Sequence, residues 1–189
     1  MSELSTNGRS IILVGLMGAG KSTIGRELSR ATGLAFLDTD SVIEEQTGMA
    51  IPDIFRDRGE RHFRLLETTL LRYIAQGVSD GGCAHIVSTG GGIILSPENR
   101  AILRQLGYVV WLTADIPTLL ARTARAQNRP LLQVDDREAT LRSLYAARAP
   151  LYEQTAHLCL DSTGLKAPEV VDSILRHAQH FFSAGQVEP

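Results

Sequence analysis

Residues 10–22 read SIILVGLMGAGKS, and this stretch decides the fold. Its first part, Ser10–Gly15, is short and rich in Ile, Leu and Val, which is typical of a buried strand. The second part, Gly15–Ser22, matches the pattern G-x-x-x-x-G-K-[ST] and runs into a segment with helical spacing. A glycine loop between a strand and a helix is the setting in which this motif wraps phosphate groups. A glycine-rich turn that serves tight packing alone is the alternative.

The rest of the chain alternates short apolar runs with longer segments of helical periodicity. The expected strands are Ser10–Gly15, Ala35–Asp38, His85–Thr89, Tyr108–Thr113 and His157–Asp161. The expected helices are Lys21–Thr32, Ile51–Gln76, Pro97–Leu106, Ile116–Arg125, Arg137–Gln154 and Pro168–Phe182. This alternation predicts an α/β fold, a doubly wound parallel sheet with helices on both faces. In such sheets the functional site lies beyond the carboxyl ends of the strands.

The composition limits the possible functions. A length of 189 residues suits one domain, 1–189, and 43% apolar residues suffice for a core. A net charge of −2 excludes a general surface for nucleic acid. Residues 11–20 are too short to span a membrane and lack a cleavage pattern, so no membrane or targeting segment is expected. Cys83 and Cys159 have no metal-binding spacing, which suggests reduced thiols in a cytoplasmic protein.

The phosphate loop assigns chemistry to its residues. Glycines let backbone N–H groups converge on phosphate oxygens, and the helix N-terminus adds partial positive charge. Lys21 can reach the β- and γ-phosphates, and the Ser22 hydroxyl can ligate Mg²⁺. Lys21 is one of only two lysines in the chain; the other is Lys166.

Two aspartates follow the second predicted strand in the sequence FLDTD. If the strand continues through them, Asp38 and Asp40 point to the same face and both can reach the nucleotide. One would then hold the metal through water and the other would orient an acceptor hydroxyl. The alternative is that Asp40 caps a helix that begins at Ser41.

Three consecutive glycines, Gly90, Gly91 and Gly92, follow the third predicted strand. They weaken any regular element, so they indicate either a ligand close to the backbone or a plain sharp turn. The third strand also lacks the aspartate that ends a typical Walker B strand, and Ser88 stands in its place. A switch-type GTPase is therefore disfavoured.

Three arginines are candidate anion-binding residues. Arg64 could bind a carboxylate through its planar fork, or it could pair with Glu60 or Glu67 on the surface. Arg129 lies in a polar stretch of suitable length for a mobile lid, from which it could reach a transferred phosphate. Arg148 could clamp a second anion. For each arginine, a solvated or structural role is the alternative.

Taken in order, the segments GLMGAGKST, DTD, GERHFRLLE, STGGGI, NRPLL and RAPLY resemble the shikimate kinase family of small P-loop kinases. The resemblance covers nearly the whole chain. It implies a five-stranded parallel sheet in the order 2-3-1-4-5, a lid at about 124–137 and a substrate-binding helical region at about 39–76. It also implies ATP-dependent phosphorylation of the 3-hydroxyl of shikimate, on the route to chorismate and the aromatic amino acids.

The resemblance also implies roles for single residues. The ATP-binding residues would be Gly18, Ala19, Gly20, Lys21, Ser22, Thr23, Arg122 over the adenine, and Arg129 in the lid. Mg²⁺ would be held by Ser22, with Asp38 acting through water. Shikimate would contact Asp40, Arg64, Gly90–Gly92 and Arg148. Asp40, Lys21 and Arg129 would carry the chemistry, and the protein would act as a cytoplasmic monomer on ATP and shikimate.

Two other functions compete with this interpretation. A related kinase of gluconate or a nucleotide would share the phosphate loop, but DTD, the Arg64 helix and the triple glycine argue against it. The second alternative is a regulatory protein that binds ligands without turnover. An added DNA-binding segment would favour it, but only about nine polar residues precede the first predicted strand.

Overall fold

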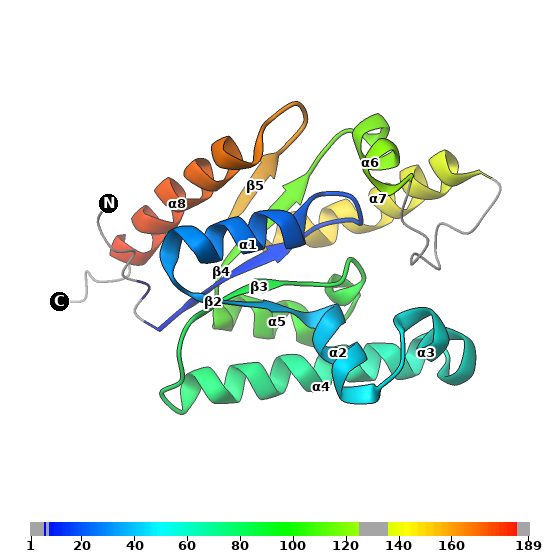
Figure 1. Ribbon diagram of the computed structural model, residues 1–189, viewed down its shortest axis with the longest axis horizontal. Helices are drawn as coiled ribbons and strands as arrows, with labels where there is room; N and C mark the ends of the chain where they lie inside the picture. Colours follow the sequence, from blue (N-terminus) through cyan, green and yellow to red (C-terminus); the bar gives the residue numbers. More distant parts are fainter. Residues whose placement is uncertain (1–5, 7, 125–135, 185–189) are drawn as a thin grey trace.

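The centre of the molecule is a parallel sheet, seen in a computed structural model that describes residues 6, 8–124 and 136–184 (Figure 1). Its five described strands lie in the order β2-β3-β1-β4-β5, and every pairing is parallel. The strands are β1 (Ser10–Val14), β2 (Ala35–Asp38), β3 (His85–Ser88), β4 (Gly107–Thr113) and β5 (Leu158–Asp161). The predicted doubly wound sheet and the strand order implied by the resemblance are confirmed.

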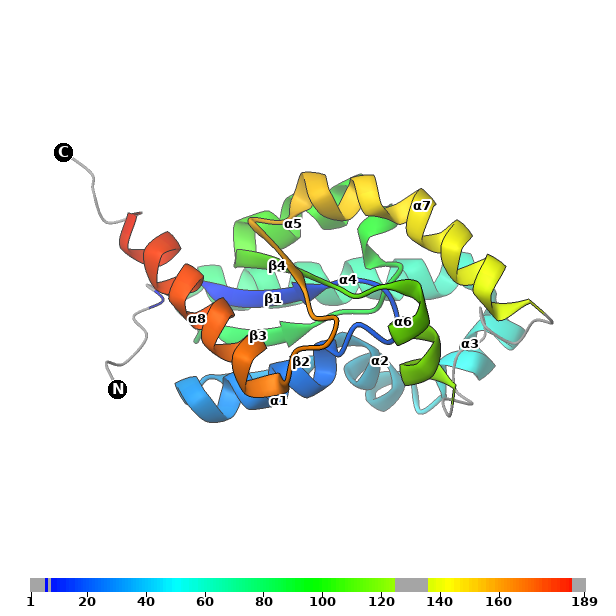
Figure 2. The ribbon, with the colours of Figure 1, turned by 90° about the horizontal axis from the view of Figure 1, so that it is seen from above.

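Helices cover both faces of the sheet, so the fold has three layers. The helices are α1 (Lys21–Thr32), α2 (Thr39–Thr47), α3 (Ile51–Arg58), α4 (Glu60–Ser79), α5 (Pro97–Leu106), α6 (Ile116–Thr123), α7 (Arg137–Thr155) and α8 (Ala167–Ala184), with a short 3₁₀ helix η1 (Ile93–Leu95). One face carries α1 and α8, and the other carries α5 and α7, with α4 beside α5 (Figures 1 and 2). Among the described residues, no helix combines the length and apolar character needed to cross a bilayer.

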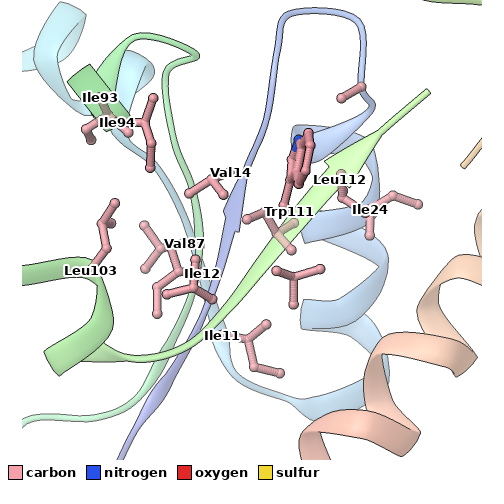
Figure 3. Packing of buried hydrophobic residues seen from close by; sticks show 14 of the residues in the cluster. Ile11, Ile12, Val14, Ile24, Val87, Ile93, Ile94, Leu103, Trp111 and Leu112 are labelled. Carbon is pink, nitrogen blue, oxygen red and sulfur yellow. The ribbon is translucent and has the colours of Figure 1, made fainter. Parts of the chain in front are cut away.

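The core forms where β1 lies between its neighbours in the middle of the sheet. Ile11, Ile12, Leu13 and Val14 have no exposed surface, because helices cover the strand from both sides. Figure 3 shows side chains from α1 and α5 packing around β1 and β4. Burial of each such side chain contributes roughly 1.5–3 kcal/mol, so the central strand is strongly stabilised. The phosphate loop is therefore attached to a rigid strand.

The predicted helix Ile51–Gln76 is wrong as a single element, because the chain breaks it at Gly59. Gly59 has φ +83° and ψ 163°, a conformation that glycine adopts far more easily than other residues. It ends α3 at Arg58 and begins α4 at Glu60. The predicted substrate-binding region, about 39–76, therefore consists of three helices, and the break turns the first residues of α4 toward α2.

The predicted lid, at about 124–137, lies almost wholly outside the described residues, and so does Arg129. Its predicted end belongs to α7, which begins at Arg137. Asp136 caps this helix, since its side chain accepts a hydrogen bond from the Ala139 N–H at 2.9 Å.

Candidate active site

The phosphate loop connects β1 to α1 at the carboxyl end of the sheet. Gly18 and Gly20 have φ of +82° and +92°, and Gly20 stands immediately before α1. Such angles are strained for other residues, so the two glycines allow the backbone of the loop to turn tightly. The ammonium of Lys21 donates to the carbonyls of Gly15 and Leu16, at 2.8 and 2.9 Å. The lysine therefore lies over the loop, where its charge can reach a bound phosphate.

Oxygen atoms from three elements meet beside the start of α1. The Ser22 hydroxyl donates to Asp38 Oδ2 at 2.7 Å, and it lies 3.3 Å from the Ser88 hydroxyl. Asp38 ends β2 and Ser88 ends β3, and the two residues are direct neighbours in the strand register. Asp38 therefore supplies, from the adjacent strand, the carboxylate that the end of β3 lacks.

The local structure of the two aspartates differs from the prediction. The strand β2 ends at Asp38 and α2 begins at Thr39, so Asp40 does not follow Asp38 along a strand. The helix cap is Asp38 rather than Asp40, because Asp38 Oδ1 accepts hydrogen bonds from the N–H groups of Asp40 and Ser41. Asp40 lies in the first turn of α2.

Asp40 faces the triple glycine. A Cβ atom added to Gly90 would lie 2.6 Å from Asp40 Oδ1 and 3.0 Å from Glu67 Oε1. The Gly90 N–H donates to the hydroxyl of Thr39, which is fully buried, at 3.2 Å. Any larger residue at position 90 would therefore displace the Asp40 and Glu67 carboxyl groups. The side chains of Asp40 and Glu67 thus require glycine at position 90, while the predicted approach of a ligand to this backbone stays a prediction.

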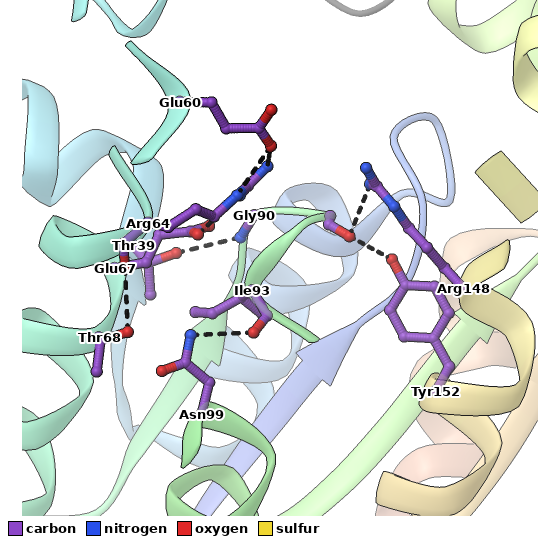
Figure 4. Close-up of polar contacts among 11 residues, drawn as sticks. Thr39, Glu60, Arg64, Glu67, Thr68, Gly90, Ile93, Asn99, Arg148 and Tyr152 are labelled. Atoms are coloured by element: carbon purple, nitrogen blue, oxygen red, sulfur yellow. Dashed lines mark hydrogen bonds and ion pairs between the residues drawn. The ribbon is translucent and has the colours of Figure 1, made fainter. Parts of the chain in front are cut away.

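Arg64 extends from the first turns of α4 toward the same segment. Its guanidinium contacts Glu67 Oε2 at 2.7 Å and Glu60 Oε1 at 2.7 Å, as Figure 4 shows. Sequence analysis offered these pairs as surface contacts, but Glu67 has no exposed side-chain surface and Arg64 has only 22%. Burial lowers the pKa of Arg64, but the two ion pairs together raise it above its ordinary value. The guanidinium therefore stays charged inside the site.

Glu67 is the most strongly perturbed carboxyl group of this site. Burial raises its pKa to about 7, despite the opposing charge of Arg64, and the nearby Asp40 raises it further. Its Oε1 atom has no hydrogen-bond partner within the part of the chain that the structure describes. A raised pKa in the folded state means that protonation of Glu67 stabilises the fold, and that this stabilisation is lost as the pH rises toward 7.

We therefore expect Glu67→Gln to change how stability depends on pH. Wild type should lose unfolding free energy relative to this variant as the pH rises from about 4.5 to above 7. The difference should reach at most about 3.5 kcal/mol, because the pKa rises from 4.5 to about 7 and one pKa unit corresponds to about 1.4 kcal/mol. Chemical denaturation at several pH values measures it. Glu98→Gln, which removes an exposed carboxylate paired with Arg72, is the control. A constant difference across the pH range would contradict the assignment.

Arg148 reaches the triple glycine from the opposite side. It lies on α7, is 5% exposed, and donates from Nη1 to the carbonyl oxygen of Gly91 at 3.0 Å. The hydroxyl of Tyr152, one turn later, donates to the same oxygen at 2.6 Å (Figure 4). A Cβ atom added to Gly92 would overlap the guanidinium of Arg64. The two predicted anion-binding arginines thus meet the same glycine segment, next to Asp40.

Arg122 lies at a separate part of the strand ends, beside the phosphate loop. Its guanidinium donates to the hydroxyl and carbonyl of Ser162, at 3.1 and 3.3 Å, and to the Gly18 carbonyl at 3.5 Å. It borders a cavity of about 510 Å³. The cavity is lined by Gly18, Ala19, Gly20, Lys21, Ser22, Thr23, Ile24, Arg122, Thr123, Ser162, Leu165, Ala167 and Val170. All six predicted nucleotide-loop residues, Gly18–Thr23, are among them.

Several residues of the site were missed by sequence reasoning. Thr39 and Tyr152 stand in the segments DTD and RAPLY but were given no role, and only the three-dimensional packing shows that they hold the glycine segment. Ser162 follows the end of β5, where the rule for open α/β sheets could have found it. The apolar wall of the cavity, Leu165, Ala167 and Val170, gave no sequence signal.

Comparison with known proteins decides the family. The family model described as shikimate kinase matches residues 17–179. The chain belongs to the shikimate kinase family. Shikimate kinase of Thioalkalivibrio sulfidiphilus is 44% identical over 174 residues, which cover 91% of this chain and 88% of the relative. Shikimate kinase of Neisseria meningitidis serogroup C is 46% identical over 171 residues, covering 90% and 95%.

Solved structures of shikimate kinases agree with this family. The shikimate kinase from Acinetobacter baumannii in complex with shikimate superposes with a TM-score of 0.85 at 39% identity, covering 95% of this chain and 96% of that one. A gluconokinase from Sinorhizobium meliloti gives a TM-score of 0.53 at 19% identity, a likeness that shows the shared fold alone. The predicted family and the prediction of a kinase are both confirmed.

Proposed function

We propose that this chain transfers the γ-phosphoryl group of ATP to the 3-hydroxyl of shikimate, using the residues gathered at the strand ends. Membership of the shikimate kinase family supports the reaction itself, a step of aromatic amino acid biosynthesis. The observation that carries the residue-level account is the convergence of Asp40, Arg64 and Arg148 on Gly90–Gly92. The two arginines can bind an anionic group, and the carboxylate can bind a hydroxyl. Such a site, built around backbone without side chains, suits an anionic polyol.

On the nucleotide side, the phosphate loop would hold ATP through Gly18–Thr23. Lys21 would place its charge on the β- and γ-phosphates, and the cavity beside Arg122 would hold the base. A hydrogen bond to Ser162 holds Arg122 in place. Because a guanidinium group is planar, it can stack on the flat ring of the base. Arg129, outside the described residues, would add positive charge from the lid as the phosphoryl group moves.

Mg²⁺ fits the oxygen atoms beside the loop. Ser22 would bind it directly and Asp38 would act through water, an arrangement typical of an ion that keeps several waters and is held mainly by phosphates. Across the described residues, no group of three or more His, Cys, Asp or Glu could form a protein-only metal cage. When bound, Mg²⁺ would neutralise charge on the transferred phosphoryl group.

On the acceptor side, Arg64 and Arg148 would bind the carboxylate of shikimate and Gly90–Gly92 would lie against its ring. Arginine suits this role because its planar fork matches a carboxylate. Asp40 would then contact a ring hydroxyl and hold it in line with the γ-phosphoryl group. In a loose transition state the hydroxyl loses its proton late, so Asp40 orients the hydroxyl first and accepts the proton afterwards.

Water must be kept from the γ-phosphoryl group, or ATP would be hydrolysed without an acceptor. A lid at about 124–137 that closes on bound substrate would meet this requirement. We propose that the enzyme acts as a monomer, because the groups assigned above gather at one site within a single chain, and that it acts in the cytoplasm, where Cys83 and Cys159 would stay reduced thiols.

Arg148→Ala should raise the KM for shikimate by about 100-fold and leave the KM for ATP within about twofold. The change removes a buried cation that pairs with the acceptor carboxylate, and such pairs are worth several kcal/mol. Steady-state kinetics with each substrate varied in turn measures both constants. Arg142→Ala on the same helix is the control, because Arg142 only pairs with Glu138 on the surface. Equal increases in both KM values would contradict the role of Arg148.

A comparison of acceptors tests the proposed function. Purified protein with ATP and Mg²⁺ should release ADP rapidly with shikimate and at background rates with gluconate or AMP. Faster release with gluconate or AMP would favour a related small-molecule kinase. Binding of ATP and shikimate without any ADP release would favour the regulatory protein.

A further inference from the structure

The Tyr152 side chain lies under the triple glycine and takes no part in the roles assigned so far. It is 1% exposed, and its ring stacks on Trp111 of β4 with centroids 5.6 Å apart and planes at 21°. Burial raises the pKa of its hydroxyl, although the charge of Arg148 opposes the change. The hydroxyl therefore keeps its proton at neutral pH and acts as a hydrogen-bond donor.

Among the described residues, the Tyr152 hydroxyl donates to one acceptor, the carbonyl oxygen of Gly91. Tyr152 and Arg148 are four residues apart on α7, so they share a helix face, and both donate to the carbonyl oxygen of Gly91. The Tyr152 bond is the shorter of the two, at 2.6 Å against 3.0 Å. Arg148 has further N–H groups, so the tyrosine lets it hold Gly91 with one nitrogen and keep the others for a ligand.

The Gly91 carbonyl also determines where the next residue lies. A peptide group is planar, so fixing the Gly91 oxygen fixes the Gly92 N–H on the opposite side of the same plane. Gly92 in turn packs against the Arg64 guanidinium without room for a single added carbon. This peptide group therefore touches Arg148 on one side and Arg64 on the other, so its position influences the spacing between the two arginines.

We propose that Tyr152 is a positioning residue for the acceptor carboxylate: its hydroxyl holds the Gly91–Gly92 peptide so that Arg64 and Arg148 stay at the separation that binds one carboxylate. The inference rests on the proposed roles of these two arginines. Without the hydroxyl, the shorter of the two hydrogen bonds is lost and the Gly91 carbonyl is held by Arg148 alone, so the peptide can shift and the spacing of the two arginines with it. Gly91 lies beside the Gly15–Met17 part of the phosphate loop, whereas the cavity assigned to ATP is lined by Gly18–Thr23, so we expect ATP binding to stay unchanged.

The test compares Tyr152→Phe with wild type in steady-state kinetics. We expect the KM for shikimate to rise about fivefold to tenfold, the effect of one lost buried hydrogen bond, with the KM for ATP unchanged. Tyr145→Phe is the matched control: Tyr145 lies on the same helix and beside the same tryptophan, at 6.3 Å, and its hydroxyl makes no hydrogen bond to the described residues. It should behave as wild type.

A purely structural role gives a different pattern. Partial unfolding lowers the apparent kcat but does not change a KM, so a loss of kcat with an unchanged shikimate KM would overturn the inference. Tyr152→4-aminophenylalanine keeps a donor on the same ring and should restore the shikimate KM toward that of wild type. A KM as high as that of Tyr152→Phe would likewise overturn the inference. Wild type that does not phosphorylate shikimate would overturn the proposed function and this inference together.

Discussion

Replacing Lys21 by methionine should lower kcat for shikimate phosphorylation by about 1,000-fold or more, since the variant lacks the cation on the transferred phosphoryl group. Methionine has a similar length and is apolar, so the loop should keep its shape. In the structure the ammonium lies 2.8 and 2.9 Å from two carbonyls of the loop, which holds the charge over the phosphate site. Coupled ADP release under saturating substrates measures the loss.

The two lysines of the chain provide a further comparison. Lys21→Arg should also inactivate the enzyme, because Lys21 is 9% exposed and a planar guanidinium does not fit between the loop carbonyls. Lys166→Arg should have no effect, because the Lys166 side chain is exposed beyond the end of β5. Substantial activity in Lys21→Met would remove the lysine from the mechanism. A comparable loss in Lys166→Arg would show that the assay responds to something other than the phosphate site.

Replacing Asp40 by asparagine should lower kcat by about 100-fold to 1,000-fold and leave ATP binding nearly unchanged. Asparagine keeps the size of the side chain but cannot accept the proton of the acceptor hydroxyl. The position is tightly packed, since a Cβ atom on the neighbouring Gly90 would lie only 2.6 Å from Asp40 Oδ1. Steady-state kcat and a separate titration with a non-hydrolysable ATP analogue distinguish the two effects.

The control for this change is Asp53→Asn, which alters an exposed carboxylate paired with Arg56 on α3. It should retain wild-type kinetics. Near-normal turnover in Asp40→Asn would show that Asp40 is not needed to orient or deprotonate the hydroxyl. Loss of ATP affinity in Asp40→Asn would instead place the residue on the nucleotide side of the site.

Much of the fold was predictable because its signals are local. The apolar run of β1 and the glycine loop after it predict a strand, a turn and a helix, and the structure has all three at the predicted positions. The strand order came only from the resemblance. The sequence pattern of β2 does not indicate whether it lies beside β3 or beside β1. The break at Gly59 was missed because one glycine among the polar residues 56–62 does not by itself predict the end of a helix, and the turn shows only in its φ of +83°.

The sequence named many of the residues that the structure brings together at the candidate site, but not their contacts with one another. Arg64 and Arg148 were recognised from their motifs, whereas their meeting at Gly91 and Gly92 depends on how α4 and α7 pack at the end of the sheet. Glu67 looked like a surface partner of Arg64, because a sequence does not reveal that the helix face it occupies is covered. The capping role of Asp38 was missed because the possible helix was expected to begin at Ser41 with Asp40 as its cap, whereas α2 begins at Thr39.

We propose that the site at Gly90–Gly92 presents the 3-hydroxyl of shikimate to the phosphate loop. Nuclear magnetic resonance of the product, correlating phosphorus with ring protons, shows which hydroxyl has been phosphorylated. We predict a single product with phosphorus coupled to the proton at carbon 3, formed with one ADP per phosphate transferred. Phosphate on another hydroxyl, a mixture of products, or ADP formed with inorganic phosphate alone would contradict the account.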